Sequence, residues 1–191
     1  MLGRWPCMSA PPTTVLRMET ESVALLVSAL SLVLAALALG WQIAQYLLSA
    51  GRPKATLLHG LVSASEAYSG PVRADGKGFD LDELRRQGMG GFEAVGIQVT
   101  NHGRAPVIIE SVKLLPRGGV MSLIPVGERV GPDLPHKLEP GANTSWFLDL
   151  DHAVTLAAAS REVLKERISG VYMTAQLGTG KTVRTRQTLR V

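Results

Sequence analysis

Cysteine is almost absent from this chain, since Cys7 is the only one among 191 residues. A single cysteine cannot form a disulfide within the chain. Any folded region must therefore be stabilised by its apolar core, and it suits a reducing compartment as well as an oxidising one.

The chain also lacks a large excess of either charge, because its formal net charge is only +4. Arg4, Arg17, Glu19 and Glu21 precede the apolar N-terminal run, which leaves 18 basic and 14 acidic residues after it. Domains that bind nucleic acid typically concentrate basic residues in a patch or stripe. The small excess here therefore predicts no nucleic-acid partner.

Groups of catalytic or metal-binding side chains are missing too. Ser145 and Ser160 lack the context of a nucleophile elbow, and Asp149 and Asp151 are placed for helix capping rather than for catalysis. The histidines are scattered along the chain with no cysteine nearby, so their spacing predicts neither a metal site nor a cofactor. We therefore predict that the protein is not an enzyme. The histidines are His59, His102, His136 and His152.

The segment Gly178–Thr182, with the sequence GTGKT, resembles part of a phosphate-binding loop. The full pattern needs a glycine where Ala175 stands and a helix after the threonine. Alternating residues follow instead, so we predict a hairpin turn. An NTP-binding enzyme that uses this segment is accordingly the least favoured function.

A long apolar run is the main feature that the chain does contain. Residues Val23–Trp41 are interrupted only by Ser28, Ser31 and Gly40. As a helix, with about 1.5 Å per residue, this run matches the hydrocarbon core of a bilayer. We predict a transmembrane helix with an interfacial extension over residues 22–50, after a disordered segment over residues 1–21.

Two alternatives concern the beginning of the chain. Translation could start at Met1, Met8 or Met18. The residues Ala36–Ala38 match the A-x-A pattern of a cleaved signal peptide. However, the apolar run is longer than a signal-peptide core and contains this site, so an uncleaved anchor is favoured.

Residues near the end of the run predict how the helix meets the membrane surface. Trp41 and Tyr46 are aromatic residues at the expected interface, and Arg52 and Lys54 are basic residues that follow it. A start at Met18 would leave no basic residue before the span. The positive-inside rule then favours the cytoplasmic side of an inner membrane for the following domain.

Small and polar residues recur along the span at steps of four and three, which places them on one face of the helix. Such a seam permits close helix contact in lipid, and it predicts self-association or pairing with another membrane helix. A span rich in alanine and serine also shows such a seam by chance, and this alternative is favoured. The seam residues are Ala24, Ser28, Ser31, Ala35, Ala38 and Gln42.

Residues 52–191 are predicted to form one domain of β-strands. Apolar and polar residues alternate in most of its segments, which is typical of half-buried strands. A change of phase predicts a bulge near Glu110 and Ser111. The predicted strands cover residues 54–63, 92–100, 107–115, 120–124, 144–150, 171–177 and 182–191.

The connections between these strands contain helices and turns. A long loop over residues 64–91 holds a short helix that Asp80 caps. A turn follows Asn101, with Gly103 at a positive φ. A longer helix is predicted from Asp151 to about residue 168. Seven strands and one helical crossover are typical of an antiparallel immunoglobulin-like (Ig-like) β-sandwich.

Arg184, Arg186 and Arg190 share one direction on the last predicted strand. They could contact anionic lipid headgroups or an acidic partner. Alternatively, they form the solvated face of an edge strand, where charge prevents aggregation. The second interpretation is favoured.

Three motifs carry a resemblance to a known group of proteins. They are NHGRAPVII at Asn101–Ile109, LEPG at Leu138–Gly141 and the hairpin GTGKTVRTR at Gly178–Arg186. With the Trp41 and Tyr46 pattern before Gly51-Arg52-Pro53, the chain resembles uncharacterised small membrane proteins of high-GC actinobacteria. Residues 64–91 depart from that pattern. The resemblance implies an Ig-like β-sandwich in a bacterial inner membrane, and no activity.

The sequence therefore favours a membrane-anchored, non-enzymatic protein-interaction module, with membrane lipid and an unidentified protein as its partners. The alternative is a subunit of a larger membrane assembly that associates through its transmembrane helix, a homo-oligomer included.

Overall fold

The computed structural model describes residues 13–127 and 129–191, with the side chains of all of these except 13–21, 47 and 48. The chain divides into two compact units between Leu48 and Ser49. Each unit is described by itself.

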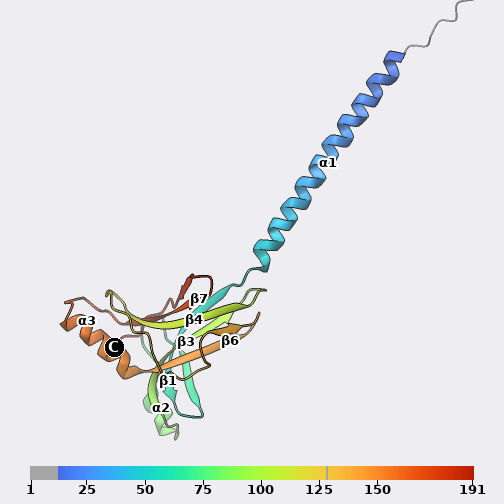
Figure 1. Ribbon diagram of the computed structural model, residues 1–191. Helices are drawn as coiled ribbons and strands as arrows, with labels where there is room; N and C mark the ends of the chain where they lie inside the picture. The colour runs from blue at the N-terminus through green and yellow to red at the C-terminus, as the bar shows by residue number, and fades with distance from the viewer. Residues whose placement is uncertain (1–12, 128) are drawn as a thin grey trace, which may run out of the picture. The chain divides into compact units, whose positions relative to one another are not determined.

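The first unit contains one continuous helix, α1 (Thr13–Ser49; Figure 1). No proline lies between Pro12 and Pro53, so no residue of that type interrupts its backbone hydrogen bonds. The segment Ser22–Tyr46 has 25 residues and a mean hydropathy of 2.6, which makes it long and apolar enough to span a membrane. The helix begins at Thr13, within the segment over residues 1–21 for which disorder was predicted, and residues 1–12 lie outside the described part.

The second unit is built mainly from β-structure, as predicted. Its strands form two antiparallel sheets of four, with the orders β2-β1-β3-β6 and β5-β4-β7-β8. The strands are β1 (Pro53–Val62), β2 (Ala67–Pro71), β3 (Phe92–Asn101), β4 (Val107–Pro116), β5 (His136–Leu138), β6 (Asn143–Asp149), β7 (Val171–Leu177) and β8 (Thr182–Arg184).

Both sheets contribute to one apolar core. Leu57, Ile97 and Trp146 come from the first sheet, Leu114 and Met173 from the second, and all five are fully buried. The indole Nε1–H of Trp146 donates to the carbonyl of Pro132 at 2.9 Å, so the one polar atom of this side chain is satisfied. The domain therefore has an apolar core to which both of its sheets contribute.

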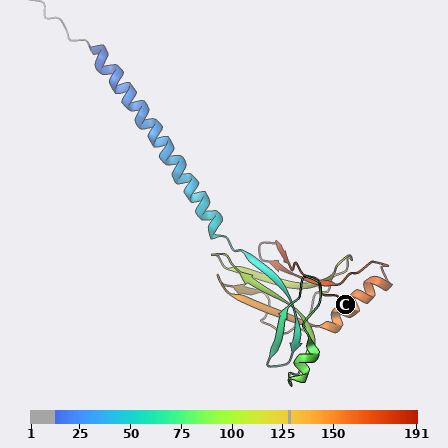
Figure 2. The same cartoon turned by 180° about the vertical axis from the view of Figure 1, so that it is seen from behind.

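Two helices accompany the sheets. Figure 1 shows α3 (Leu150–Glu162) at one margin of the domain, and Figure 2 shows α2 (Leu81–Arg86) beside the β1–β2 hairpin. The cap of α2 is confirmed, because the Asp80 carboxylate accepts from the Glu83 amide at 3.2 Å.

The longer helix differs from the prediction at both ends. Asp149, not Asp151, is its N-cap, and the Asp149 carboxylate accepts from the Asp151 amide at 2.9 Å. The helix ends at Glu162 rather than near residue 168, and Lys165 then adopts a left-handed conformation with φ of 57°. Ala153, Leu156, Ala157 and Ser160 form the buried face of this helix.

The predicted loop over residues 64–91 contains a strand, β2, that pairs with β1. A Cβ on Gly60 would lie 1.9 Å from the carbonyl oxygen of Tyr68, so only glycine allows the two strands to approach this closely. Residue patterns indicate β2 only weakly, because this strand contains Gly70 and ends in Pro71.

The predicted strand over residues 120–124 is wrong. Only Leu123 pairs, through a single bridge with Leu114, while the side chains of Val120 and Ile124 are exposed. Conversely, the structure contains the short strand β5 at His136–Leu138, where no strand was predicted. The bulge in β4 is confirmed as a register shift between Ile109 and Ser111.

Candidate functional site

The domain contains a hollow of about 400 Å³, here called the basic pocket. Four parts of the chain that are distant in the sequence meet there: the turn after β2, the residue after β4, Ser169 shortly before β7, and a segment that follows β8. Its lining residues are Ala74, Asp75, Gly76, Arg117, Ser169, Arg186, Gln187, Thr188 and Arg190.

Arg117 follows the last residue of β4 and is held by its backbone. Its amide donates to the carbonyl of Gly170 at 2.7 Å, and its own carbonyl accepts from the Ser169 amide at 3.1 Å. Its guanidinium Nη1 donates to the hydroxyl of Thr188 at 2.8 Å. One of its five N–H groups is thus engaged, and Arg117 joins two walls of the basic pocket.

The segment that carries Arg186 leaves the sheet as a bulge. On one side, the Thr185 amide donates to the Met173 carbonyl at 3.0 Å, and the Thr185 hydroxyl accepts from the Met173 amide at 3.2 Å. On the other side, Leu189 pairs with Val171. The predicted strand over residues 182–191 is therefore wrong after Arg184, because residues 186–188 do not pair with β7.

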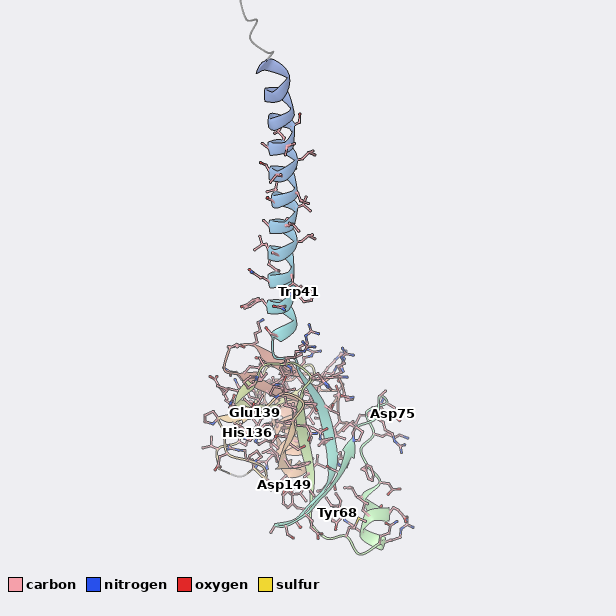
Figure 3. The ribbon with its side chains drawn as sticks, turned by 90° about the vertical axis from the view of Figure 1, so that its right-hand side faces the viewer. Trp41, Tyr68, Asp75, His136, Glu139 and Asp149 are labelled. Atoms are coloured by element: carbon pink, nitrogen blue, oxygen red, sulfur yellow. The ribbon has the colours of Figure 1, made fainter. Side chains whose placement is uncertain are left out.

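Arg190 is positioned by a tight turn. The Arg190 amide donates to the carbonyl of Gly76 at 3.1 Å. Gly76 has a φ of +83°, and a Cβ there would lie 3.0 Å from the Cγ of Arg190. Asp75 stabilises the same turn by accepting from the Lys77 amide at 3.0 Å. Figure 3 shows Asp75 at the margin of the domain, on the side away from His136.

A buried histidine fixes the chain that follows this turn. Nδ1 of His59 accepts from the Phe79 amide at 2.9 Å, so Nε2 carries the proton and donates to Oε1 of Glu93 at 3.1 Å. A Cβ on Gly78 would lie 2.3 Å from Nδ1 of His59, so the chain passes directly against the ring. With both ring nitrogens engaged, His59 acts as a structural support of the pocket wall.

The charge of the basic pocket is strongly positive. Three arginines line it against one acidic residue, Asp75. Among residues 13–127 and 129–191, the ion pairs of the structure involve none of these three guanidinium groups. Their positive charge is therefore not neutralised within the described part of the domain.

Comparison with known proteins gives no family for this chain. No protein-family model, no curated protein and no solved structure matches it. Its function must therefore be argued from its own residues.

The structure separates the three arginines that the sequence grouped together. Arg186 and Arg190 line the basic pocket, whereas Arg184 lies on β8 with its guanidinium 5.6 Å from the centre of the Tyr172 ring. Arg117 joins the pocket instead, 69 positions before Arg186 in the sequence. No pattern in the sequence around Arg117 indicates this role.

The residues predicted at the membrane interface lie on either side of the unit boundary. Trp41 and Tyr46 are 66% and 79% exposed on α1. Arg52 and Lys54 are exposed in the second unit. The Arg52 amide donates to Oδ1 of Asn101 at 3.2 Å, so the first residues of the domain are tied to its β3–β4 turn.

Asn101 was predicted only as the residue before a turn, and the structure shows that its side chain is fully buried. Its Oδ1 also accepts from the Gly103 amide at 3.0 Å, and its Nδ2 donates to the carbonyls of Ala105 at 2.8 Å and Leu138 at 3.3 Å. Gly103 does not have the predicted positive φ. It is glycine because a Cβ there would lie 2.3 Å from the carbonyl oxygen of Ala50.

The predicted seam of α1 is exposed along its length. The hydroxyls of Ser28 and Ser31 each donate to a carbonyl one turn earlier, those of Ala24 and Val27, at 2.8 Å. These donors are thus satisfied inside the helix. Contact through the seam would therefore depend on close packing rather than on serine hydrogen bonds. The other seam residues are Ala35, Ala38 and Gln42.

The GTGKT segment is a hairpin turn, as predicted. Gly180 has a φ of +77°, and the Leu177 amide donates to the Lys181 carbonyl at 2.8 Å. Strand β8 follows at Thr182, where a phosphate-binding loop would continue as a helix.

A second hollow of about 320 Å³ adjoins the N-cap of α3. Its walls are largely apolar, from Phe92, Val130 and Phe147, together with the polar residues Arg129, Asp149 and His152. The Asp149 carboxylate is already engaged as the helix cap.

Elsewhere, a hydrogen bond to Glu66 raises the pKa of the Tyr68 phenol, and neither residue lines the basic pocket.

Proposed function

We propose that the chain is a non-enzymatic protein-interaction module that α1 anchors in a membrane. The observation that carries this proposal is the exposed apolar surface of Ser22–Tyr46, whose most apolar stretch has no buried residue. Eleven Val, Leu and Ile side chains of this segment are at least 52% exposed. Since burial of one such side chain is worth about 1.5–3 kcal/mol, exposing all of them to water would cost on the order of 15–30 kcal/mol. A lipid environment removes this cost.

The membrane position of the domain belongs to the same proposal. Arg52 and Lys54 directly follow the span, which favours a cytoplasmic domain in an inner membrane if translation starts at Met18. A cysteine at the exposed turn residue Thr179, in a Cys7→Ser background, tests this. We expect a membrane-impermeant maleimide to label it only after the cells are broken. Labelling in intact cells would place the domain outside.

Insertion of the helix is tested by charge substitution near the middle of the span. Arginine costs about 2.5–3.5 kcal/mol per residue at a helix centre on insertion scales. Leu30→Arg combined with Val33→Arg should therefore move the protein from the membrane fraction to the soluble fraction or to aggregates. Gln42→Arg, near the interface, is the matched control and should stay with the membrane. Retention of the double variant in the membrane would contradict the anchor.

The interaction role is tested by purification of the full chain from its native membrane, followed by identification of co-purifying proteins. We expect one partner in a fixed ratio to the chain. Purification of the chain alone, after gentle cross-linking, would contradict this role. If a chain reduced to α1 retains the same partner, the alternative function is favoured, a subunit of a larger membrane assembly that associates through its helix.

We further propose that the domain is an Ig-like β-sandwich. The order β1-β3-β6 corresponds to immunoglobulin strands A-B-E, and the order β5-β4-β7-β8 corresponds to C′-C-F-G. The domain differs from that fold in β2 beside β1 and in α3 between β6 and β7. The shared core of the two sheets supports the same assignment.

A further inference from the structure

We propose that the basic pocket binds an organic phosphate through Arg117, Arg186 and Arg190. This inference does not require α1 to span a membrane, so it can hold or fail independently of the proposed anchor. It rests on the charge, the donor geometry and the size of the pocket.

The charge and donor groups favour a phosphate over a singly charged anion. Three arginines line the pocket together with one acidic residue, Asp75, and their guanidinium groups form no ion pair in the described part of the domain, which leaves an excess of two positive charges at neutral pH. Arginine presents paired N–H donors that match two oxygens of a phosphate, and these charge-assisted bonds are about twice as strong as neutral ones. A phosphate monoester is close to doubly charged at neutral pH and neutralises the site.

The backbone positions that carry these three arginines are fixed before any ligand arrives. The Arg117 backbone is paired with Ser169 and Gly170, and the backbone of Arg190 is bonded to Gly76. Thr185 and Leu189 fix both ends of the bulge that carries Arg186. A preorganised site loses less conformational entropy when a ligand binds.

The size of the pocket indicates that the phosphate carries an organic group. The volume of about 400 Å³ lies within the range of roughly 300–1,000 Å³ that is usual for small-molecule sites. Ser169 and Thr188 also line the pocket, and each has a hydroxyl that bonds to Arg117. Because a hydroxyl both donates and accepts, these groups suit a ligand that itself bears hydroxyls.

Two sources could supply this chemistry: a soluble sugar or glycerol phosphate, or the headgroup of a phospholipid. Glycerol 3-phosphate represents both, because it is a soluble phosphate monoester and also the polar part of phosphatidic acid. D-Glycerate is the matched control ligand, since it keeps the hydroxyls and carries one negative charge on a carboxylate.

The experiment is calorimetric titration of glycerol 3-phosphate into the full chain in phosphatidylcholine nanodiscs. We expect saturable binding that weakens at least tenfold in Arg186→Ala, Arg190→Ala or Arg117→Ala. Arg184→Ala removes the same charge two residues from Arg186 but outside the pocket, and it should bind as the wild type does. D-Glycerate should bind at least tenfold more weakly than glycerol 3-phosphate.

Asp75→Asn is expected to increase the affinity for glycerol 3-phosphate, an effect that a folding defect would not produce. It keeps an oxygen for the Lys77 amide and removes the one negative charge of the pocket, so glycerol 3-phosphate should bind at least twofold more tightly. Weaker binding by this variant would contradict the proposal. So would the absence of saturable binding by the wild type, equal weakening in Arg184→Ala, or equal affinity for D-glycerate.

The source is distinguished by adding phosphatidic acid to the same nanodiscs. If the lipid headgroup occupies the pocket, the apparent Kd for free glycerol 3-phosphate rises with the fraction of phosphatidic acid, and Arg186→Ala removes this rise. An unchanged Kd assigns the pocket to a soluble phosphate. Failure of α1 to anchor the chain would show instead as loss of the protein from the nanodiscs, with binding retained.

Discussion

Replacement of Asn101 with alanine should destabilise the domain more than any other single change at the β3–β4 turn. The side chain is fully buried and makes four hydrogen bonds, to the amides of Arg52 and Gly103 and to the carbonyls of Ala105 and Leu138. Alanine leaves all four backbone groups without this partner. The expected defect therefore lies at the point where the chain enters the domain.

The size of the effect follows from these contacts. A buried polar group that loses its partner costs about 1–3 kcal/mol, and water can still reach the partly buried groups among the four. We therefore expect a loss of about 2–5 kcal/mol in the free energy of unfolding, a large share of the 5–15 kcal/mol that is usual for a domain. With a urea m-value of about 2 kcal/mol/M, the middle of the usual range, the unfolding midpoint should fall by about 1–2.5 M.

Tryptophan fluorescence during urea unfolding of the full chain in detergent micelles measures this change. Trp5→Phe and Trp41→Phe leave Trp146, which is fully buried in the domain core, as the only reporter. Asn143→Ala, at an exposed position of β6, is the matched control and should change stability by less than about 0.5 kcal/mol. If Asn101→Ala unfolds at the same urea concentration as Asn143→Ala, the reasoning is refuted.

The remaining predictions concern a close approach in β3 and the seam of α1. Gly96→Ala should lower the free energy of unfolding by about 1–3 kcal/mol, because its Cβ would lie 2.4 Å from the Phe147 ring. Thermal unfolding measures this change. Gly90→Ala, with open space around its Cβ, is the control and should remain within about 0.5 kcal/mol of the wild type. If α1 self-associates through its seam, a cysteine at Ser31 should form disulfide-linked dimers in membranes faster than one at Leu32, both in a Cys7→Ser background; equal rates would count against the seam.

The local patterns of this sequence predicted most strands but not their pairing partners. Burial of one face of β3 and β7 requires apolar residues at alternate positions, and this pattern is visible in the sequence. Both strands therefore lie within a residue or two of their predicted positions. β2 was missed because its stability comes from close contact with β1 at Gly60, a tertiary effect without a local signature.

The end of the chain shows why the site was only partly predicted. Alternation placed Arg184, Arg186 and Arg190 on one strand face, but the side-chain bond of Thr185 to β7 starts a bulge that sends the last two arginines to the basic pocket. Arg117, which directly follows the last residue of β4, completes the pocket. The position of its backbone depends on hydrogen bonds to Ser169 and Gly170. Neither long-range contact can be inferred from residue spacing.

Alkaline carbonate extraction of the native product, combined with its intact mass, tests the membrane anchor most directly. The account predicts that the protein stays in the pelleted membranes and that its mass includes the segment Ser22–Tyr46. Recovery in the alkaline supernatant, with a mass that lacks this segment, would show a cleaved signal sequence and contradict the account.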